Sequence, residues 1–398
     1  MTRSRRRDLL IILILGALST VSPFSIDMYL PAFPQIARDL GTTPAEISLS
    51  VSGYFVGLAV GQLFYGPLLD RFGRKKPLYG GLSLFVVASL GCLTARSPGL
   101  FIAFRLLQAM GGCVAQVGAV TMVRDFFPVE ESAKILSLLF LVLSVSPLFA
   151  PSIGGFVATT AGWPWIFVIL AGFAVIVMAL IAVLLPEGRQ PDPDISLRPS
   201  AIMRGFVNVI AHPQFYTYAI GGAFSFSGLF VYVTGSPIIF IDTFHVDPWI
   251  YGLIFAALGC SFIGGSQLNH WLSRRYHSRQ IFRAALICQN IVVFAIFAGT
   301  AFGWYGLVAN IFLLMVYLPF CGVAFPNAAA IALAPFTKNV GSAAALLGFM
   351  QMGIGAFAST GVGFLHSSDS LPIFAVMSAT AVIGLGILLV NQNRVRNA

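Results

Sequence analysis

The chain has 398 residues, of which 58% are hydrophobic and only 9% are charged, and its formal net charge is +9. Soluble globular domains carry charge on about a quarter of their residues, so this composition excludes an ordinary soluble protein and indicates an integral membrane protein. The apolar runs are continuous rather than alternating, which excludes a transmembrane β-barrel.

Twelve apolar runs are long enough to cross a bilayer. A spanning helix uses about 20 such residues and satisfies its own backbone hydrogen bonds in lipid. The predicted spans lie near residues 9–30, 47–69, 77–95, 100–123, 134–156, 163–185, 215–241, 249–272, 281–301, 304–333, 341–365 and 371–390.

The basic residues divide unevenly between the two sides of the membrane. If the N-terminus is cytoplasmic, all of the 23 Lys and Arg residues fall in cytoplasmic segments except Arg38, Arg96 and Arg105. This asymmetry follows the positive-inside rule. With an even number of spans, it predicts a bacterial inner-membrane protein whose two termini both lie in the cytoplasm. The positive charge is therefore a topology signal, and we expect no nucleic-acid partner.

The first span follows a basic N-terminus, an arrangement that also resembles a secretory signal peptide. We expect it to be retained, because an even division into twelve spans requires it. It ends in SIDMYLP (25–31), where Asp27 is the one acidic residue that belongs to no loop. Removal from water raises the pKa of a carboxylic acid, so Asp27 is a candidate for proton coupling and substrate binding. The alternative is that Asp27 ends the helix before Pro31 and is solvated at the outer surface.

The connection after the second span reads GPLLDRFGRKK (66–76). It resembles the signature loop of the major facilitator superfamily, G-x-L-x-D-R-x-G-R-K. Glycines at this place allow close helix approach and a tight turn, and the resemblance implies that the charges form an inner gate in which Arg74 pairs with an acid ending span four. The predicted gating residues are Gly66, Asp70, Arg71, Gly73, Arg74 and Asp125.

Span four carries Arg105 within an apolar helix, in a string similar to the R-x-x-Q-G motif of the same superfamily. An unpaired arginine in hydrocarbon costs about 2.5–3.5 kcal/mol even on permissive scales. We therefore expect Arg105 to face a wet cavity or a partner, the alternative being that it extends to the outer surface. It is the second predicted proton-coupling residue, because a guanidinium that approaches or leaves Asp27 would change how readily that carboxylate binds a proton.

Span five contains SVSPLFAPSIGGF (144–156). Two prolines four residues apart bend a helix, and adjacent glycines let a neighbouring helix pack closely. The string resembles the tail of the G-P-x-x-G-G motif of the antiporter branches, with Ala150 in place of a glycine. The predicted helix-kink residues are Pro147, Pro151, Gly154 and Gly155.

The longest polar interval, PEGRQPDPDISLRPS (186–200), separates spans six and seven. Its prolines and charges predict a cytoplasmic linker. The apolar periodicity that follows, from Ile202 to Ile210, predicts an interfacial helix, unless it is an early start of span seven. Six spans on each side predict two six-helix pseudo-repeats, with an N-terminal bundle over 1–186, a linker over 187–213 and a C-terminal bundle over 214–398.

Candidate substrate-binding residues are those with aromatic or polar side chains inside spans. An apolar or weakly polar cargo in a midplane cavity would contact such groups, although membrane helices also use glutamine and asparagine to hold one another. The candidates are Asp27, Tyr54, Arg105, Gln108, Gln116, Phe226, Phe230, Asn327 and Gln351.

Together, SIDMYLPAFP, YGPLLDRFGRKK, MVRDFFPVEESAK, PLFAPSIGG and PNAAAIALAPF resemble the Bcr/CflA-type exporters among the drug:proton antiporters of this superfamily. The resemblance implies a major facilitator fold and a proton-driven exporter of drugs or small amphipathic molecules, with protons and the bilayer as its other partners and the monomer as the working unit. The alternative on the same fold is a proton-coupled importer of a nutrient such as a nucleoside.

Other classes of protein fit the sequence less well. The five histidines are scattered over loops and span ends, and no cluster has the spacing of metal ligands or of a catalytic nucleophile, so we expect neither an enzyme nor a cofactor or metal site. No P-loop motif is present, so transport is expected to draw on an ion gradient or to run downhill.

Overall fold

The computed structural model describes residues 5–188, 190–192, 206–336, 340–364 and 369–396. Its long helices are α1 (Arg5–Asp27), α3 (Pro44–Phe72), α4 (Lys75–Thr94), α5 (Pro98–Phe126), α6 (Val129–Thr160), α7 (Pro164–Leu184), α9 (Pro213–Pro237), α10 (Pro248–Leu272), α11 (Ser278–Ala301), α12 (Leu307–Leu333), α13 (Val340–Phe364) and α14 (Leu371–Arg396). Short elements are η1 (Leu30–Ala32), α2 (Phe33–Asp39) and η2 (Ile238–Thr243).

The predicted all-α fold with twelve long helices is confirmed. Among the described residues, eleven helices are long and apolar enough to cross a membrane. The twelfth, α6, stands where the fifth span was expected and is 32 residues long. The first span differs from its prediction, because α1 ends at Asp27 and the chain continues as η1 and α2 instead of running as one helix to residue 30.

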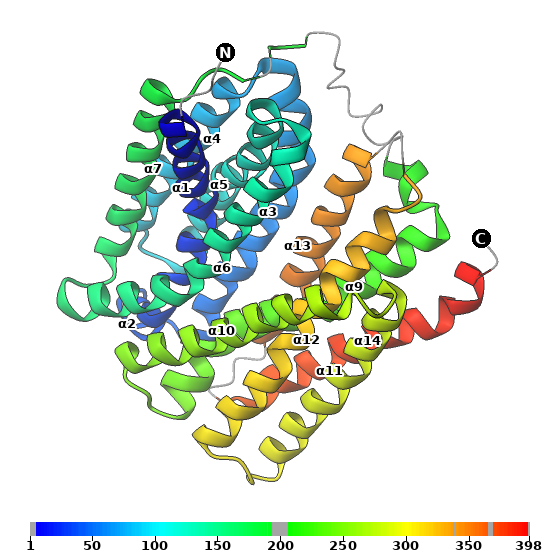
Figure 1. Ribbon diagram of the computed structural model, residues 1–398. Helices are drawn as coiled ribbons and strands as arrows, with labels where there is room; N and C mark the ends of the chain where they lie inside the picture. The colour runs from blue at the N-terminus through cyan, green and yellow to red at the C-terminus, as the bar shows by residue number, and fades with distance from the viewer. Residues whose placement is uncertain (1–4, 189, 193–205, 337–339, 365–368, 397–398) are drawn as a thin grey trace.

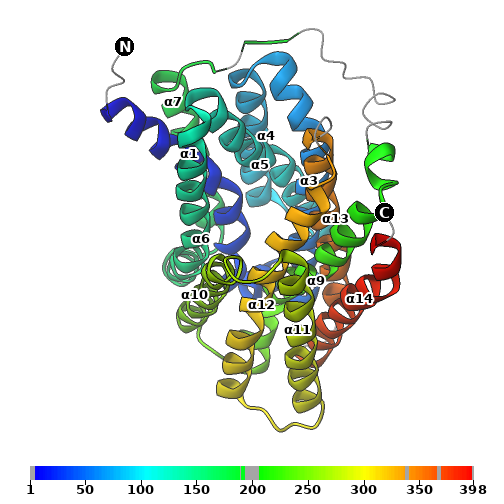
Figure 2. The ribbon, with the colours of Figure 1, turned by 45° about the vertical axis from the view of Figure 1, so that its right-hand side comes forward.

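The helices form two groups that lie side by side (Figures 1 and 2). Helices α1 to α7 make up the first group, here the N-half, and α9 to α14 make up the second, here the C-half. The two halves meet along α3 with α13 and along α6 with α10. One end of the molecule carries the connection between α7 and α9 and is called the linker side. The opposite end carries η1 and α2 and is called the η1 side.

The helix starts explain where the chain enters each span. Thr43, Ser97 and Asp247 each accept a hydrogen bond from a backbone N–H two or three residues later, at 2.8–3.3 Å. A proline follows each of the three directly. A side-chain cap satisfies an orphan N–H of the first turn, and proline there loses nothing because its missing N–H would be unpaired. These signals determine the residues at which α3, α5 and α10 begin.

Large apolar side chains remain exposed on the outside of both halves. Val183 of α7 is 79% exposed, Phe312 of α12 is 64% exposed and Phe357 of α13 is 77% exposed. Exposed apolar surface on this scale is unfavourable in water and matches a lipid environment. The chain is therefore a multi-pass membrane protein.

The connection between the halves is only partly described. Residues 186–188 and 190–192 are non-helical, and residues 206–210 are helical, with Val209 fully buried against the C-half. Ile202 and the other residues of the predicted interfacial helix before Phe206 lie outside the described residues.

Candidate functional site

A cavity of about 470 Å³ lies between the two halves. Its walls come from α1, α3, α5 and α6 of the N-half and from α9, α10, α12 and α13 of the C-half, while α4, α7, α11 and α14 supply none of its lining residues. These four helices thus lie outside the group of eight that surrounds the cavity, and the cavity belongs to both halves. Such a position is typical of a carrier site.

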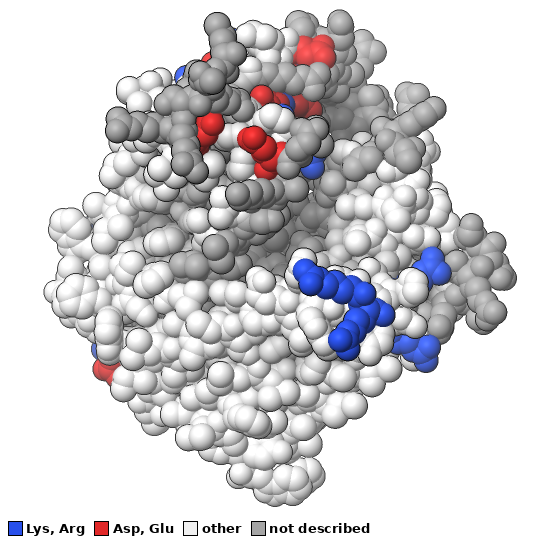
Figure 3. Space-filling model, viewed as in Figure 1, with Lys and Arg blue, Asp and Glu red and all other residues white. Residues whose placement is uncertain are grey.

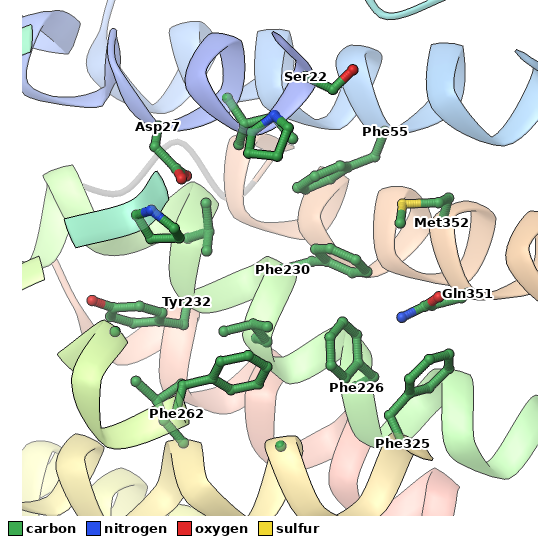
Figure 4. A pocket seen from close by; sticks show the side chains of 18 of the residues that line it. Ser22, Asp27, Phe55, Phe226, Phe230, Tyr232, Phe262, Phe325, Gln351 and Met352 are labelled. Carbon is green, nitrogen blue, oxygen red and sulfur yellow. The ribbon is translucent and has the colours of Figure 1, made fainter. Parts of the chain in front are cut away.

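Seven of the 24 residues that line the cavity are aromatic. The ring centroids of Phe226 and Phe325 are 4.9 Å apart, and those of Phe230 and Phe55 of the N-half are 4.4 Å apart. Other aromatic lining residues are Tyr232, Phe255 and Phe262. Figure 4 shows these rings around the open space, with Asp27 at one end and Gln351 and Met352 at the other. This wall suits an apolar or aromatic guest.

The halves are in close contact on the η1 side of the cavity. The hydroxyls of Ser52 in α3 and Ser359 in α13 are hydrogen bonded at 2.9 Å. A β-carbon placed on Gly252 of α10 would lie 2.8 Å from the Cα of Ser152 in α6. A direct hydrogen bond between the halves and a glycine with no room for a β-carbon leave no channel, so the seam on the η1 side is closed at these two places.

Asp27 is the only carboxylate among the described residues that line the cavity, and none of them is Lys, Arg or His. Asp27 is 5% exposed, and within the described part of the chain its carboxylate makes neither a hydrogen bond nor an ion pair. Tyr232 and Tyr251 of the C-half lie within electrostatic reach of it. Asp27 therefore faces the cavity rather than open water, and a charge on it would have no partner.

Arg105 is fully buried inside the N-half and does not line the cavity. Its Nη1 donates to Ser25 Oγ at 2.8 Å and to Gln108 Oε1, and its Nη2 donates to the carbonyl oxygen of Ser25 at 2.9 Å. The guanidinium lies 4.1 Å and 4.4 Å from the ring centroids of Tyr29 and Tyr54. The partners of this cation are thus neutral groups and aromatic faces.

Arg105 was expected to face a wet cavity or a partner, and the structure gives it partners while placing it away from the cavity. This corrects the prediction that Arg105 binds substrate, and Arg105 makes no bond to Asp27. Helix geometry gives the reason: residues two apart point about 200° apart around a helix of 3.6 residues per turn. Ser25 faces Arg105, so Asp27 points to the other side of α1.

The remaining predicted substrate residues divide into two sets. Phe226, Phe230, Gln116 and Gln351 line the cavity. Tyr54, Gln108 and Asn327 do not, which corrects the prediction for these three.

Each of these three is held inside its own bundle. Tyr54 packs against Arg105. The Nε2 of Gln108 donates to Ser89 Oγ at 2.7 Å, and the Nδ2 of Asn327 donates to Asn269 Oδ1 at 2.6 Å. A side chain that satisfies a neighbouring helix in this way is unavailable to a guest.

The predicted gating charges come together at the linker side of the N-half. Arg74 Nε lies 2.6 Å from Asp125 Oδ2, and Arg74 Nη1 lies 2.7 Å from Asp70 Oδ1. Gly73 directly follows α3 with φ of 79°, a left-handed conformation that favours glycine. Gly66 and Arg71 lie in the last two turns of α3. The geometry ties the end of α3 to the end of α5.

Charged side chains gather on the linker side. Figure 3 shows acidic side chains together with some basic ones on the N-half and a group of basic side chains on the C-half, with a hollow between them. The basic residues of the C-half in this region are Arg274, Arg275, Arg279 and Arg283.

The predicted kink residues lie inside α6, which stays helical through Pro147 and Pro151. Pro147 also lines the cavity. Gly154 and Gly155 are both buried, one turn further toward the η1 side.

Several site residues had no recognisable signal in the sequence. Phe55, Tyr232, Phe255, Phe262, Phe325 and Met352 line the cavity, but the chain has 36 phenylalanines, so aromatic type alone does not single them out. Ser25 is likewise one of many serines. The contacts of these residues depend on which helix faces meet.

Comparison with known proteins gives consistent results. The family model "Major Facilitator Superfamily" matches residues 15–360. The "Uncharacterized MFS-type transporter YdgK" of Bacillus subtilis is 31% identical, covering 93% of this chain and 92% of that protein. The "Bicyclomycin resistance protein homolog" of Haemophilus influenzae is 30% identical over 96% of each.

Solved structures match the fold over nearly the whole chain. A bacterial homolog of the human lysosomal transporter Spinster aligns with a TM-score of 0.74 at 14% identity, covering 98% of both chains. The xylose transporter XylE of Escherichia coli aligns with a TM-score of 0.72 at 13% identity, covering 96% of this chain and 97% of XylE. The chain therefore belongs to the Major Facilitator Superfamily, a family of transporters and not of enzymes, and within it to the Bcr/CflA-type group.

Proposed function

We propose that the protein exports drugs or small amphipathic molecules across the bacterial inner membrane in exchange for protons, as a monomer that works by alternating access. In this proposal both termini and the linker side are cytoplasmic, and the η1 side faces the periplasm. The names of relatives, which include a bicyclomycin resistance protein homolog and multidrug resistance proteins MdtL, support drug export.

The placement of Asp27 is the observation that carries the proposal. It is the one carboxyl group in a largely apolar cavity shared by both halves, and it has no cationic partner there. A charge in such a place is costly, and a bound proton removes it. Proton binding from the periplasm and cargo binding from the cytoplasm can then exclude one another at one site.

Alternating access requires the two bundles to move as units. We assign residues 1–186 and 214–398 to these units and residues 187–213 to the linker between them. The closed seam on the η1 side and the cavity between the halves support a state that receives cargo from the cytoplasm. The opposite state would separate α6 from α10, exposing Asp27 to the periplasm.

The charge cluster on the linker side would act as the inner gate. Arg74 is 3% exposed and bonds both Asp70 and Asp125, so it ties α3 to α5 within the N-half. The N-half rim carries both acidic and basic residues, and its acidic residues would attract the basic rim of the C-half when the linker side closes.

Cargo would be held mainly by aromatic contact. Phe226, Phe230 and Phe55 provide ring faces, while Gln116 and Gln351 provide hydrogen-bonding amides. In this proposal Asp27 acts on cargo and proton alike, whereas Arg105 acts on Asp27 only through α1.

The direction of flux tests the proposal. Purified protein is reconstituted into liposomes, and efflux and uptake of a radiolabelled phenicol and of bicyclomycin are measured with the pH gradient imposed in each direction. Export predicts cargo movement opposite to the proton gradient. Movement of cargo with the gradient would instead support the proton-coupled importer, and the same vesicles tested with a labelled nucleoside address its cargo.

Growth of cells that lack their own exporters gives a second readout. Expression should raise the inhibitory concentration of phenicols or bicyclomycin, and an unchanged concentration for all compounds with normal protein levels would contradict drug export.

A further inference from the structure

The chain segment at Asp27 is supported on the side that faces away from the cavity. Because α1 ends at Asp27, carbonyl groups of its last turn lack the partner that a continuing helix would supply. The carbonyl oxygen of Ser25 is one of these groups, and Arg105 Nη2 donates to it at 2.9 Å. One support of the segment therefore comes from α5.

Gly154 of α6 supplies the second support. A β-carbon built on Gly154 would lie 1.6 Å from the carbonyl oxygen of Met28 and 2.6 Å from its carbonyl carbon. Atoms do not approach this closely without bonding, so any larger residue at 154 must displace the backbone directly after Asp27. The missing side chain of Gly154 allows α6 to press against this peptide.

Gly155, the next residue, faces the other half. A β-carbon there would lie 2.8 Å from the carbonyl oxygen of Pro248, at the start of α10. Two successive glycines thus contact two different backbones: Gly154 touches the Asp27 segment of its own half, and Gly155 touches the seam with the C-half.

The helix before these glycines is able to bend. Pro147 and Pro151 lack the N–H groups that would complete the α6 hydrogen-bond ladder, and prolines in helix interiors produce kinks. The part of α6 beyond Pro151 can consequently follow α10 without moving the rest of α6. Any such movement carries Gly154 and Gly155 together, because they belong to the same turn.

We propose that Gly154 is a positioning residue for Asp27, and that the glycine pair links the place of this carboxylate to the closure of the seam between α6 and α10. This inference rests on the proposed role of Asp27 in proton coupling. Gly154 touches neither proton nor cargo and acts through the peptide of Met28. Gly155 sets the fit of the seam without touching the Asp27 segment.

The titratable groups around Asp27 come from several elements. Tyr232 of α9 and Tyr251 of α10 approach from the C-half. Arg105 of α5 lies behind α1, together with Tyr29 and Tyr54. From α6 the cavity receives Pro147, which is not titratable. A displacement of the Asp27 backbone changes its distance to all these groups, so it should change the pH dependence of transport.

The test compares Gly154→Ala, Gly155→Ala and Gly172→Ala in liposomes, with a labelled phenicol as the probe. Gly172 is the control because a β-carbon there meets nothing within 4 Å. Transport rate is measured against pH, with and without a gradient. Gly154→Ala should move the pH midpoint by about one unit, a change in the proton-binding equilibrium of roughly tenfold. Gly155→Ala should lower the maximal rate and move the midpoint less than Gly154→Ala does, and Gly172→Ala should match the wild type.

A double variant shows whether Gly154 acts through Asp27. Downhill flux of Asp27→Asn and of Asp27→Asn/Gly154→Ala should show the same pH dependence, since effects that share one route are not additive. A wild-type midpoint for Gly154→Ala, or an equal shift for Gly155→Ala, would overturn the inference.

The same measurements separate the two proposals. If Asp27→Asn keeps full gradient-driven transport, the coupling role itself fails. If it loses that transport while Gly154→Ala keeps the wild-type profile, only the positioning role fails. Should Gly154→Ala not fold, Ser25→Ala removes one Arg105 bond from the same segment, and a wild-type profile for that variant would count against the inference.

Discussion

Ser25 in the N-half and Ser225 in the C-half lie in the first helix of their bundles, and each is held at two atoms by one side chain. Arg105 donates to the hydroxyl and the carbonyl of Ser25 at 2.8 and 2.9 Å. The amide of Gln289 in α11 accepts from Ser225 Oγ at 2.7 Å and donates to the Ser225 carbonyl at 2.9 Å. Each half thus supports its first helix with one polar side chain, which comes from the fourth long helix of the N-half and from the third long helix of the C-half.

The two clusters differ in charge. Gln289 is neutral and also donates to the hydroxyl of Tyr317 at 3.2 Å. Arg105 is a fully buried cation whose partners are a serine, a glutamine and aromatic faces. The difference teaches that support of a first helix does not need a charge. The charge in the N-half therefore calls for a separate explanation. In the proposed mechanism Arg105 acts on Asp27 through the last turn of α1, where it bonds Ser25.

Of the substitutions considered, removal of the Arg105 side chain should lower stability and transport the most. Arg105→Leu loses three hydrogen bonds, each worth about 1–3 kcal/mol when a buried partner is left unsatisfied. We expect the lowest thermal unfolding midpoint of the series in detergent and less than about a tenth of wild-type gradient-driven transport. Near-normal stability and transport would show that the N-half cluster is dispensable.

The other buried arginine of the N-half sharpens the contrast, because Arg74 does bond carboxylates. Asp125→Asn removes the charge that faces Arg74 Nε at 2.6 Å, and breaking a buried pair costs about 3–5 kcal/mol when nothing compensates. Asp70 remains as a partner, so we expect a smaller loss than for Arg105→Leu. Transport should slow while its pH midpoint stays unchanged, as measured in liposomes over a series of pH values.

Gln289→Leu is the matched change in the C-half. It leaves the Ser225 groups and the Tyr317 hydroxyl without their partner, at a cost of about 1–3 kcal/mol. The thermal midpoint should fall less than for Arg105→Leu, and the pH profile of transport should remain that of the wild type. A shifted profile would mean that the C-half cluster also takes part in proton coupling.

The smallest effect is expected at the aromatic wall. Phe226→Leu removes ring contacts worth about 0.5–1.5 kcal/mol, which is about a two- to tenfold loss of affinity for an aromatic probe. Phe357→Leu is the control, since Phe357 is 77% exposed on the outside of the C-half. Binding of a labelled phenicol to purified protein measures both, and equal affinities for the two variants would place the guest elsewhere.

Much of the fold follows from the sequence because each crossing demands a long apolar run. Asp27 and Arg105 can be identified from the sequence as well, because they are isolated charged residues within apolar spans. Their relative placement is not visible, since it depends on the end of α1 at Asp27 and on the spacing of two positions between Ser25 and Asp27, which turns their side chains to different sides of the helix. Neutral polar residues such as Ser225 and Gln289 are not distinctive in the sequence, so their pairing is recognised only from the packing of the helices.

The account depends most on Asp27 as the proton-coupling group. The direct measurement is uptake of protons by liposomes during export of a labelled phenicol, with wild-type protein and Asp27→Asn compared at equal amounts. The account predicts coupled proton flux for the wild type. For Asp27→Asn it predicts downhill cargo movement without coupled proton flux and without response to an imposed pH gradient. Undiminished proton flux and gradient-driven export in Asp27→Asn would contradict it.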